Sequence, residues 1–266
     1  MNNVVLLVGS EGRIAQVHKK ALNNLRLKFI EVANGEFDVS DVKEKISFAD
    51  ICTPTDTHYE LVKYFLENNL NVFCEKPLAL KTKETKELIR LSEETKTKLL
   101  VNIPYYFMYS DDLKKSNLSQ HNFRYRFRND EWVFQSDWMK DEDKSGGILY
   151  DLGSHFTPII SKLNNGEIKD VELIWLDRDD CTHIPIAVEF NVLGNIKCEV
   201  SLSWKTNMHP WIDLKISRFQ RYNWEETAIF EYMLKKMSDE SVEYKGFYND
   251  LVVGDMILEN VFRKVY

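Results

Sequence analysis

The sequence predicts an α/β protein with an N-terminal domain built on a doubly wound parallel sheet, and a C-terminal α+β domain with a mostly antiparallel sheet. In residues 1–104, short continuous apolar runs alternate with segments of helical spacing, which is typical of repeated strand–helix units. After residue 104, strands with alternating polar and apolar residues replace the continuous runs, as in antiparallel strands with one solvated face. We therefore expect one domain over residues 1–104 and a second over residues 105–266.

Five apolar runs predict the first sheet: Val4–Val8, Leu27–Ala33, Phe48–Cys52, Leu70–Cys74 and Leu99–Ile103. Amphipathic segments between them predict three helices: Gly12–Leu25, Thr57–Asn68 and Thr82–Thr97. A further segment, Ser40–Ile46, is long enough only for a short helix, with Ser40 as its N-cap.

The second domain has five expected strands: His121–Phe127, Val171–Leu176, Ile186–Val192, Lys197–Trp204 and Ile212–Ile216. Its expected helices are Gly147–Lys162, Glu225–Met237 and Leu251–Val265. With few helices, the second domain would leave one apolar sheet face uncovered unless a partner buried it, and from this we predict a homodimer or homotetramer.

Composition excludes several classes of protein. The 266 residues carry a formal net charge of −7 and no basic tract, so no nucleic-acid partner is expected. No apolar run reaches the roughly 18–20 residues of a membrane helix, and the first ten residues read as a strand, not a signal peptide. The four cysteines form no CxxC pair, which favours reduced thiols and a cytoplasmic location.

A glycine-containing turn, Gly9-Ser10-Glu11-Gly12-Arg13-Ile14-Ala15, joins the first strand to the first helix. A dinucleotide site needs glycine where the backbone approaches a pyrophosphate, and helix N-terminal amides to hold its charge. Gly12 and Ala15 fit the second and third positions of GxGxxG/A, whereas Ser10 takes the first and Gly9 stands one residue early. Candidate cofactor-binding residues here are Gly9, Ser10, Gly12, Arg13 and Ile14; the alternative is a plain strand–helix turn.

The end of the second strand leaves the choice of cofactor open. Asn34 stands where a ribose-binding acid is expected, and Glu36 is nearby. No Arg or Lys follows the strand, so a 2′-phosphate is not favoured either. Arg13 is the nearby cation that could approach a phosphate, unless it is simply solvated.

Two further candidate segments follow neighbouring strands, at the edge where α/β sheets bind ligands. Thr53, Pro54 and His58 come after the third strand, although Thr55 or Thr57 capping a helix would explain much of this segment. Glu75 and Lys76 come after the fourth strand and precede Pro77. The alternative for these two is an exposed ion pair beside a strand-breaking proline.

The last candidate pair is Asp151 and His155. On one helix they would be four residues apart and in mutual reach. A carboxylate beside a histidine can hold one tautomer and raise its basicity, which suits a general acid/base; a structural pair is the alternative. Asp151, His155 and His183 are scattered and lack ligand spacing, so no metal site is expected.

Taken in order, these pieces resemble the Gfo/Idh/MocA family of glucose–fructose oxidoreductase and inositol dehydrogenase, over nearly the whole chain, including His18 in the first helix and the final Tyr248–Tyr266. The resemblance implies an N-terminal Rossmann domain that binds NAD or NADP as cofactor, and a sugar, sugar-nucleotide or cyclitol substrate. It also implies that Lys76 lies near the nicotinamide and the reacting hydroxyl, with the Lys76–Pro77 bond often cis. By the same resemblance His155 accepts the proton, Asp151 orients substrate or His155, and Pro54 and His58 border the nicotinamide ribose.

Some features depart from the family pattern. The stretch between the second and third strands is short, the first glycine is displaced, and tyrosines follow the fifth strand where many relatives carry Arg. The predicted activity is NAD(P)-dependent hydride transfer to or from a secondary alcohol or ketone of a sugar or sugar nucleotide. The alternatives are a non-catalytic binding or assembly protein, and NAD-assisted elimination or hydrolysis.

Overall fold

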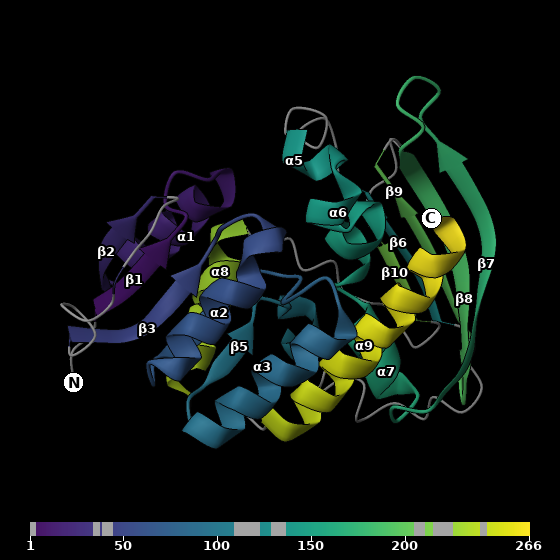
Figure 1. Ribbon diagram of the computed structural model, residues 1–266. Coiled ribbons are helices and arrows are strands. Elements are labelled where there is room, and N and C mark those ends of the chain that lie inside the picture. Colours follow the sequence, from purple (N-terminus) through teal and green to yellow (C-terminus); the bar gives the residue numbers. More distant parts are fainter. Residues whose placement is uncertain are drawn as a thin grey trace. The chain divides into compact units, whose positions relative to one another are not determined.

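The computed structural model describes residues 4–33, 38, 45–108, 123–128, 137–204, 211–214, 226–239 and 244–266. The chain forms two compact units (Figure 1). The first contains residues 1–79, 83–104 and 222–242, and the second contains residues 80–82, 105–221 and 243–266. The main change of unit after Pro104 coincides with the expected boundary, but the chain later returns to the first unit.

The first unit is built on a five-stranded parallel sheet in the order β2-β1-β3-β4-β5. Its strands are β1 (Val4–Val8), β2 (Lys28–Val32), β3 (Ile46–Ile51), β4 (Asn71–Cys74) and β5 (Leu99–Val101). The strands are almost wholly buried except for β2, at one edge of the sheet, as continuous apolar runs predict. The predicted Rossmann arrangement is confirmed. The expected helix at Ser40 lies outside the described residues.

Four of the described helices accompany this sheet. They are α1 (Arg13–Asn24), α2 (His58–Glu67), α3 (Thr82–Thr95) and α8 (Glu226–Ser238), and the short 3₁₀ turn η2 (Thr55–Thr57) leads into α2. Of these helices, α1 and α2 contact strands of the sheet. The last of the four, α8, packs against α1. This helix was expected in the second domain, because the sequence of an amphipathic helix does not indicate which sheet it packs on.

The second unit is built on a mixed, mostly antiparallel sheet in the order β10-β6-β9-β8-β7. Its strands are β6 (Phe123–Arg128), β7 (Ile168–Arg178), β8 (Pro185–Gly194), β9 (Cys198–Ser203) and β10 (Trp211–Leu214). Only the β6–β9 pair is parallel. The predicted fold class is therefore confirmed for this unit too.

The helical elements of the second unit are α5 (Asp137–Lys140), α6 (Glu142–Ser145), the π-helical turn η4 (Leu149–Gly153), α7 (Thr157–Leu163) and α9 (Tyr244–Val265). The long helix α9 packs against α7 and β7 (Figure 1). A Cβ on Gly254 of α9 would lie 2.8 Å from the Pro158 nitrogen, so the two helices approach at a distance that only glycine permits. None of the described helices is both long and apolar enough to cross a membrane.

The two faces of this sheet differ in chemistry. One face of β8 and β9 is apolar and buried, with Val188, Phe190 and Leu202 almost fully shielded. On the other face, Glu189 pairs with Ser201, whose hydroxyl donates to its carboxylate at 3.0 Å. An apolar outer face, the premise of the predicted oligomer, is therefore wrong for β8 and β9. Exposed apolar side chains on the edge strand β7 are Ile174 and Trp175, and the oligomer stays a prediction.

Replacing Gly254 with alanine should destabilise the protein by about 1–3 kcal/mol, because the new methyl group would press on the backbone of α7. Gly246→Ala in the same helix is the matched control, since a Cβ there meets nothing within 4 Å. That control should stabilise α9 by up to about 1 kcal/mol. Urea unfolding of both variants measures the contrast, and equal effects would contradict the close packing of α9 on α7.

Candidate functional site

The glycine turn has the conformation that its sequence requires. Gly9 has φ +80°, and a Cβ there would lie 2.8–2.9 Å from Thr53 and the Cys52 carbonyl. The amides of Gly9 and Ser10 both donate to the Val32 carbonyl, at 2.9 and 3.1 Å. Gly9, one residue before the expected first glycine of the motif, thus forms the turn. The motif still leads directly into α1.

The N-terminus of α1 lacks a counter-charge of its own. Gly12 is its N-cap, no side chain caps the helix, and no acidic residue lies in the first turn. The first-turn amides of a helix have no partner within the helix, and its dipole is positive at this end. Ile14 of this turn packs on Leu7 and Cys52, while Arg13 is exposed. These features fit the phosphates of a dinucleotide. Asn34 and Glu36 lie outside the described residues.

His58 joins the turn after β3 to the turn after β4. Its ring is buried, with Nδ1 2.7 Å from the Pro77 carbonyl and Nε2 2.9 Å from the Thr53 carbonyl. The two carbonyls favour the protonated ring, but burial has the larger effect. The pKa of His58 is therefore lowered. Thr57 is the N-cap residue of α2, as one alternative expected, but its hydroxyl lies 2.7 Å from the Pro54 carbonyl and makes no capping hydrogen bond.

Glu75 is buried, which overturns the alternative of an exposed Glu75–Lys76 pair. Its carboxylate accepts hydrogen bonds from His18 Nε2 at 2.9 Å, from Asn102 Nδ2 at 2.6 Å and from the Lys76 backbone N–H at 3.2 Å. Burial opposes its ionisation, but the hydrogen bond and charge of His18, together with Asn102 and Lys76, outweigh burial and hold the pKa of Glu75 below its ordinary value. The Lys76–Pro77 peptide bond is cis, as the resemblance implied.

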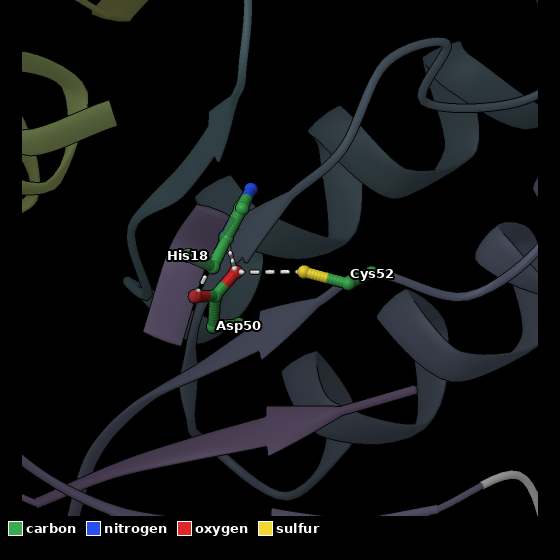
Figure 2. A group of neighbouring side chains, drawn as sticks. All are labelled: His18, Asp50 and Cys52. Atoms are coloured by element: carbon green, nitrogen blue, oxygen red, sulfur yellow. Dashed lines mark hydrogen bonds and ion pairs between the residues drawn. The ribbon is translucent and has the colours of Figure 1, made fainter. Parts of the chain in front are cut away.

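His18 is the residue whose importance sequence reasoning missed. It is fully buried, and its Nδ1 lies 2.9 Å from both oxygens of Asp50. Figure 2 draws these contacts as dashed lines. Burial alone would lower the pKa of His18, but the Asp50 carboxylate overcomes burial and raises it well above the usual value. His18 is therefore an imidazolium between Asp50 and Glu75. The available signal was a histidine on the apolar face of an amphipathic helix.

The ligand-type atoms of His18, Asp50 and Cys52 lie within 4.8 Å of one another, a spacing that would also suit a metal ion. Both ring nitrogens of His18 are already bonded to carboxylates. Burial and the Asp50 charge raise the pKa of the Cys52 thiol, which disfavours the thiolate that metals bind. The group fits a hydrogen-bonded ion network, and the expectation of no metal stays a prediction.

Asp151 and His155 belong to the second unit, and the single helix expected over residues 147–162 is wrong. The π-helical η4 ends at Gly153, and α7 begins only at Thr157. The Trp204 indole donates to Asp151 Oδ2 at 3.1 Å. The His155 ring packs edge-on against Tyr105, with ring centroids 5.8 Å apart. A shared pocket for Lys76, Asp151 and His155 stays a prediction.

Comparison with known proteins agrees with this fold. A family model described as "Oxidoreductase family, NAD-binding Rossmann fold" matches residues 31–103, from β2 to the end of β5. Residues 31–103 match the Gfo/Idh/MocA family. The predicted nicotinamide dinucleotide cofactor is thereby confirmed at the level of the family. The glycine turn lies before residue 31, outside the matched segment.

Individual proteins that resemble this chain are distant in sequence. Inositol 2-dehydrogenase of Rhizobium meliloti is 26% identical over 167 residues, which cover 54% of this chain and 50% of the relative. The alignment thus spans about half of that relative's length.

Solved structures match over nearly the whole chain. GenD2 from gentamicin A biosynthesis, in complex with NAD, has a TM-score of 0.79 at 16% identity, covering 98% of this chain and 93% of its own. The WlbA dehydrogenase of Thermus thermophilus, with NAD and UDP-GlcNAcA, has a TM-score of 0.74 at 18% identity, covering 96% and 94%. These likenesses show the fold.

We expect Asp50→Asn to destabilise the first unit by about 3–5 kcal/mol near neutral pH, because it leaves a buried imidazolium half-paired. The folded-state pKa of His18 is raised, so its stabilisation is complete below the ordinary pKa and is lost as pH rises through the raised one. The difference between wild type and Asp50→Asn should therefore shrink at alkaline pH. Urea unfolding from pH 6 to 10 measures it.

Asp56→Asn is the control for this experiment, because Asp56 is exposed. Its effect should stay within about 0.5 kcal/mol at every pH. A difference between wild type and Asp50→Asn that grows with rising pH would contradict the protonated His18.

Proposed function

We propose that this chain is an NAD(P)-dependent oxidoreductase that transfers a hydride between nicotinamide and a secondary alcohol or ketone of a sugar or sugar nucleotide. The observation that carries the proposal is the turn from Gly9 to Gly12, which opens onto an uncapped helix N-terminus at the carboxyl edge of a parallel sheet. The family match of residues 31–103 supports it.

In this proposal the backbone of Gly9, Ser10 and Gly12 accommodates the pyrophosphate, and the first-turn amides of α1, including those of Arg13 and Ile14, hold its charge. Thr53 and Pro54 border the same edge, and His58 fixes their turn. Asn34 is our candidate for the ribose hydroxyls. Bound nicotinamide supplies the acceptor or donor of the hydride, and the protein supplies position and electrostatics.

The chain's own residues move the proton. His155 accepts it from the substrate hydroxyl during oxidation, and the Lys76 ammonium stabilises the developing alkoxide. The Trp204 indole occupies one oxygen of Asp151, which supports a role for Asp151 in orientation and not in proton transfer. The substrate class is supported by relatives that act on inositol or bind a sugar nucleotide.

We further propose a homodimer or homotetramer in the cytoplasm. The location is supported by four cysteines that form no disulfide, three of them buried. Light scattering at micromolar concentration tests the assembly, and a monomeric mass would contradict it.

Gly12→Asp tests cofactor binding separately from folding. Aspartate is a good N-cap, so the helix should be unharmed, but its carboxylate would stand where the cofactor phosphates bind. We expect wild type to quench NADH or NADPH fluorescence on binding, and Gly12→Asp to weaken that affinity at least about tenfold, or about 1.4 kcal/mol. Gly12→Ser, a cap without charge, is the control and should bind more tightly than Gly12→Asp. Failure of wild type to bind either nucleotide would favour the non-catalytic alternative.

His155→Ala should lower kcat about 10²–10⁴-fold while cofactor affinity stays unchanged, because only proton transfer is lost. Lys76→Ala should lower kcat and also weaken substrate or cofactor binding. Steady-state kinetics over a panel of sugars, sugar nucleotides and cyclitols, read at the reduced-nicotinamide absorbance, provides the test. A His155→Ala variant with full turnover would remove His155 from the mechanism. Cofactor that stays bound through purification, with product formed but no net change in that absorbance, would favour the elimination or hydrolysis alternative.

A further inference from the structure

We propose that His18 and Glu75 are positioning residues, a buried ion pair that holds the peptide carrying Lys76 in one place. Its consequence for catalysis rests on the function proposed above, whereas the positioning itself can be tested without any cofactor.

The Glu75 carboxylate joins three segments of the first unit. Its Oε1 accepts from His18 in α1 and from Asn102 after β5, at 2.9 and 2.6 Å. Its Oε2 accepts from the backbone N–H of Lys76 at 3.2 Å. Because both oxygens are used, the carboxylate cannot rotate without losing a bond. The Lys76 amide is therefore anchored to α1 and to the end of β5 through one side chain.

His18 is itself held on every side. Asp50 of β3 binds Nδ1, and the Phe230 ring of α8 lies 4.4 Å away, with Phe73 of β4 at 5.8 Å. The titratable groups that face it are Asp50 of β3, Cys52 directly after β3 and Glu75 after β4. The first two fix the ring from one side, which commits its Nε2 proton to Glu75.

A second restraint acts on Pro77, at the other end of the segment formed by residues 75–77. The Pro77 carbonyl accepts from buried His58 at 2.7 Å. Residues 75–77 are thus tied at Glu75 and at Pro77, and the half-buried Lys76 lies between the two ties. Both ties are histidine hydrogen bonds, which are directional in a way that apolar contacts are not.

Stability alone is a weak reason for such a pair. Burying ions costs several kcal/mol each, and apolar residues of similar volume often serve as well or better. A carboxylate that accepts from its neighbour's backbone N–H instead fixes one conformation. The geometry points to positioning because the chain of bonds from Asp50 through His18 and Glu75 ends on Lys76 itself.

Amide hydrogen exchange tests the proposal without cofactor. In Glu75→Gln and His18→Gln, exchange at the Lys76 amide should rise at least tenfold relative to the Val72 amide, which donates to the Lys98 carbonyl in the same sheet. Val62→Ala is the matched control, because Val62 is a fully buried residue of α2 outside the network. It should lower the melting temperature but leave the ratio of the two exchange rates within twofold of wild type.

An unchanged ratio in both network variants would overturn the proposal, and so would an equal rise in Val62→Ala, since the effect would then be general loosening. If the variants do not fold, an NMR titration of the wild-type protein tests the proposal instead. Between pH 6 and 10 the ¹⁵N signals of the His18 ring and the Lys76 amide signal should titrate with one midpoint. Separate midpoints would overturn the proposal.

NADH binding and kinetics then separate this proposal from the proposed function. If both hold, Glu75→Gln lowers kcat at least tenfold more than Val62→Ala does. If wild type binds no nicotinamide cofactor, the proposed function fails, while the exchange ratio still decides whether His18 and Glu75 position Lys76.

Discussion

The hydrogen-bonded chain from Asp50 through His18 to Glu75 connects segments of the first unit that are far apart in sequence. It links α1 to β3 and to the end of β4, and Asn102 extends it to the end of β5. Each group would be costly to bury by itself, so removing one leaves the others unpaired. The arrangement at the carboxyl edge of the sheet therefore depends on all of these groups being present together.

Much of the first unit could be predicted because its strands are continuous apolar runs bounded by polar turns. β1 has the predicted bounds, and β4 differs by one residue at its start. The place of α8 could not be predicted, because its packing on α1 depends on residues some 200 positions earlier in the chain. The break between η4 and α7 was also hidden, since residues 147–162 keep a helix-like apolar pattern. Gly153, where η4 ends, lies close to α9: a Cβ there would be 2.6 Å from Leu258.

The candidate site shows the same division between local and distant causes. The glycine turn could be predicted because the residues that form it are seven consecutive positions in the sequence. His18 could not, because its partners lie 32 and 57 residues away and no local pattern identifies them. Glu75 was noticed for its place beside Lys76, but its burial depends on α1 and β5. Sequence reasoning thus found the groups that would face a ligand more readily than the groups that hold them.

The displaced glycine motif illustrates how a departure in sequence can leave the local chemistry intact. Gly9 supplies the left-handed turn one residue early, and the Val32 carbonyl takes up the amides of both Gly9 and Ser10. Gly12 donates back to Gly9, which closes the turn at the point where α1 begins. These three amides are consumed by the turn itself. The capacity to hold an anion therefore lies in the first turn of α1, where no acidic side chain competes. The position of the helix start, more than the spacing of the glycines, is the feature on which a phosphate site in this chain depends.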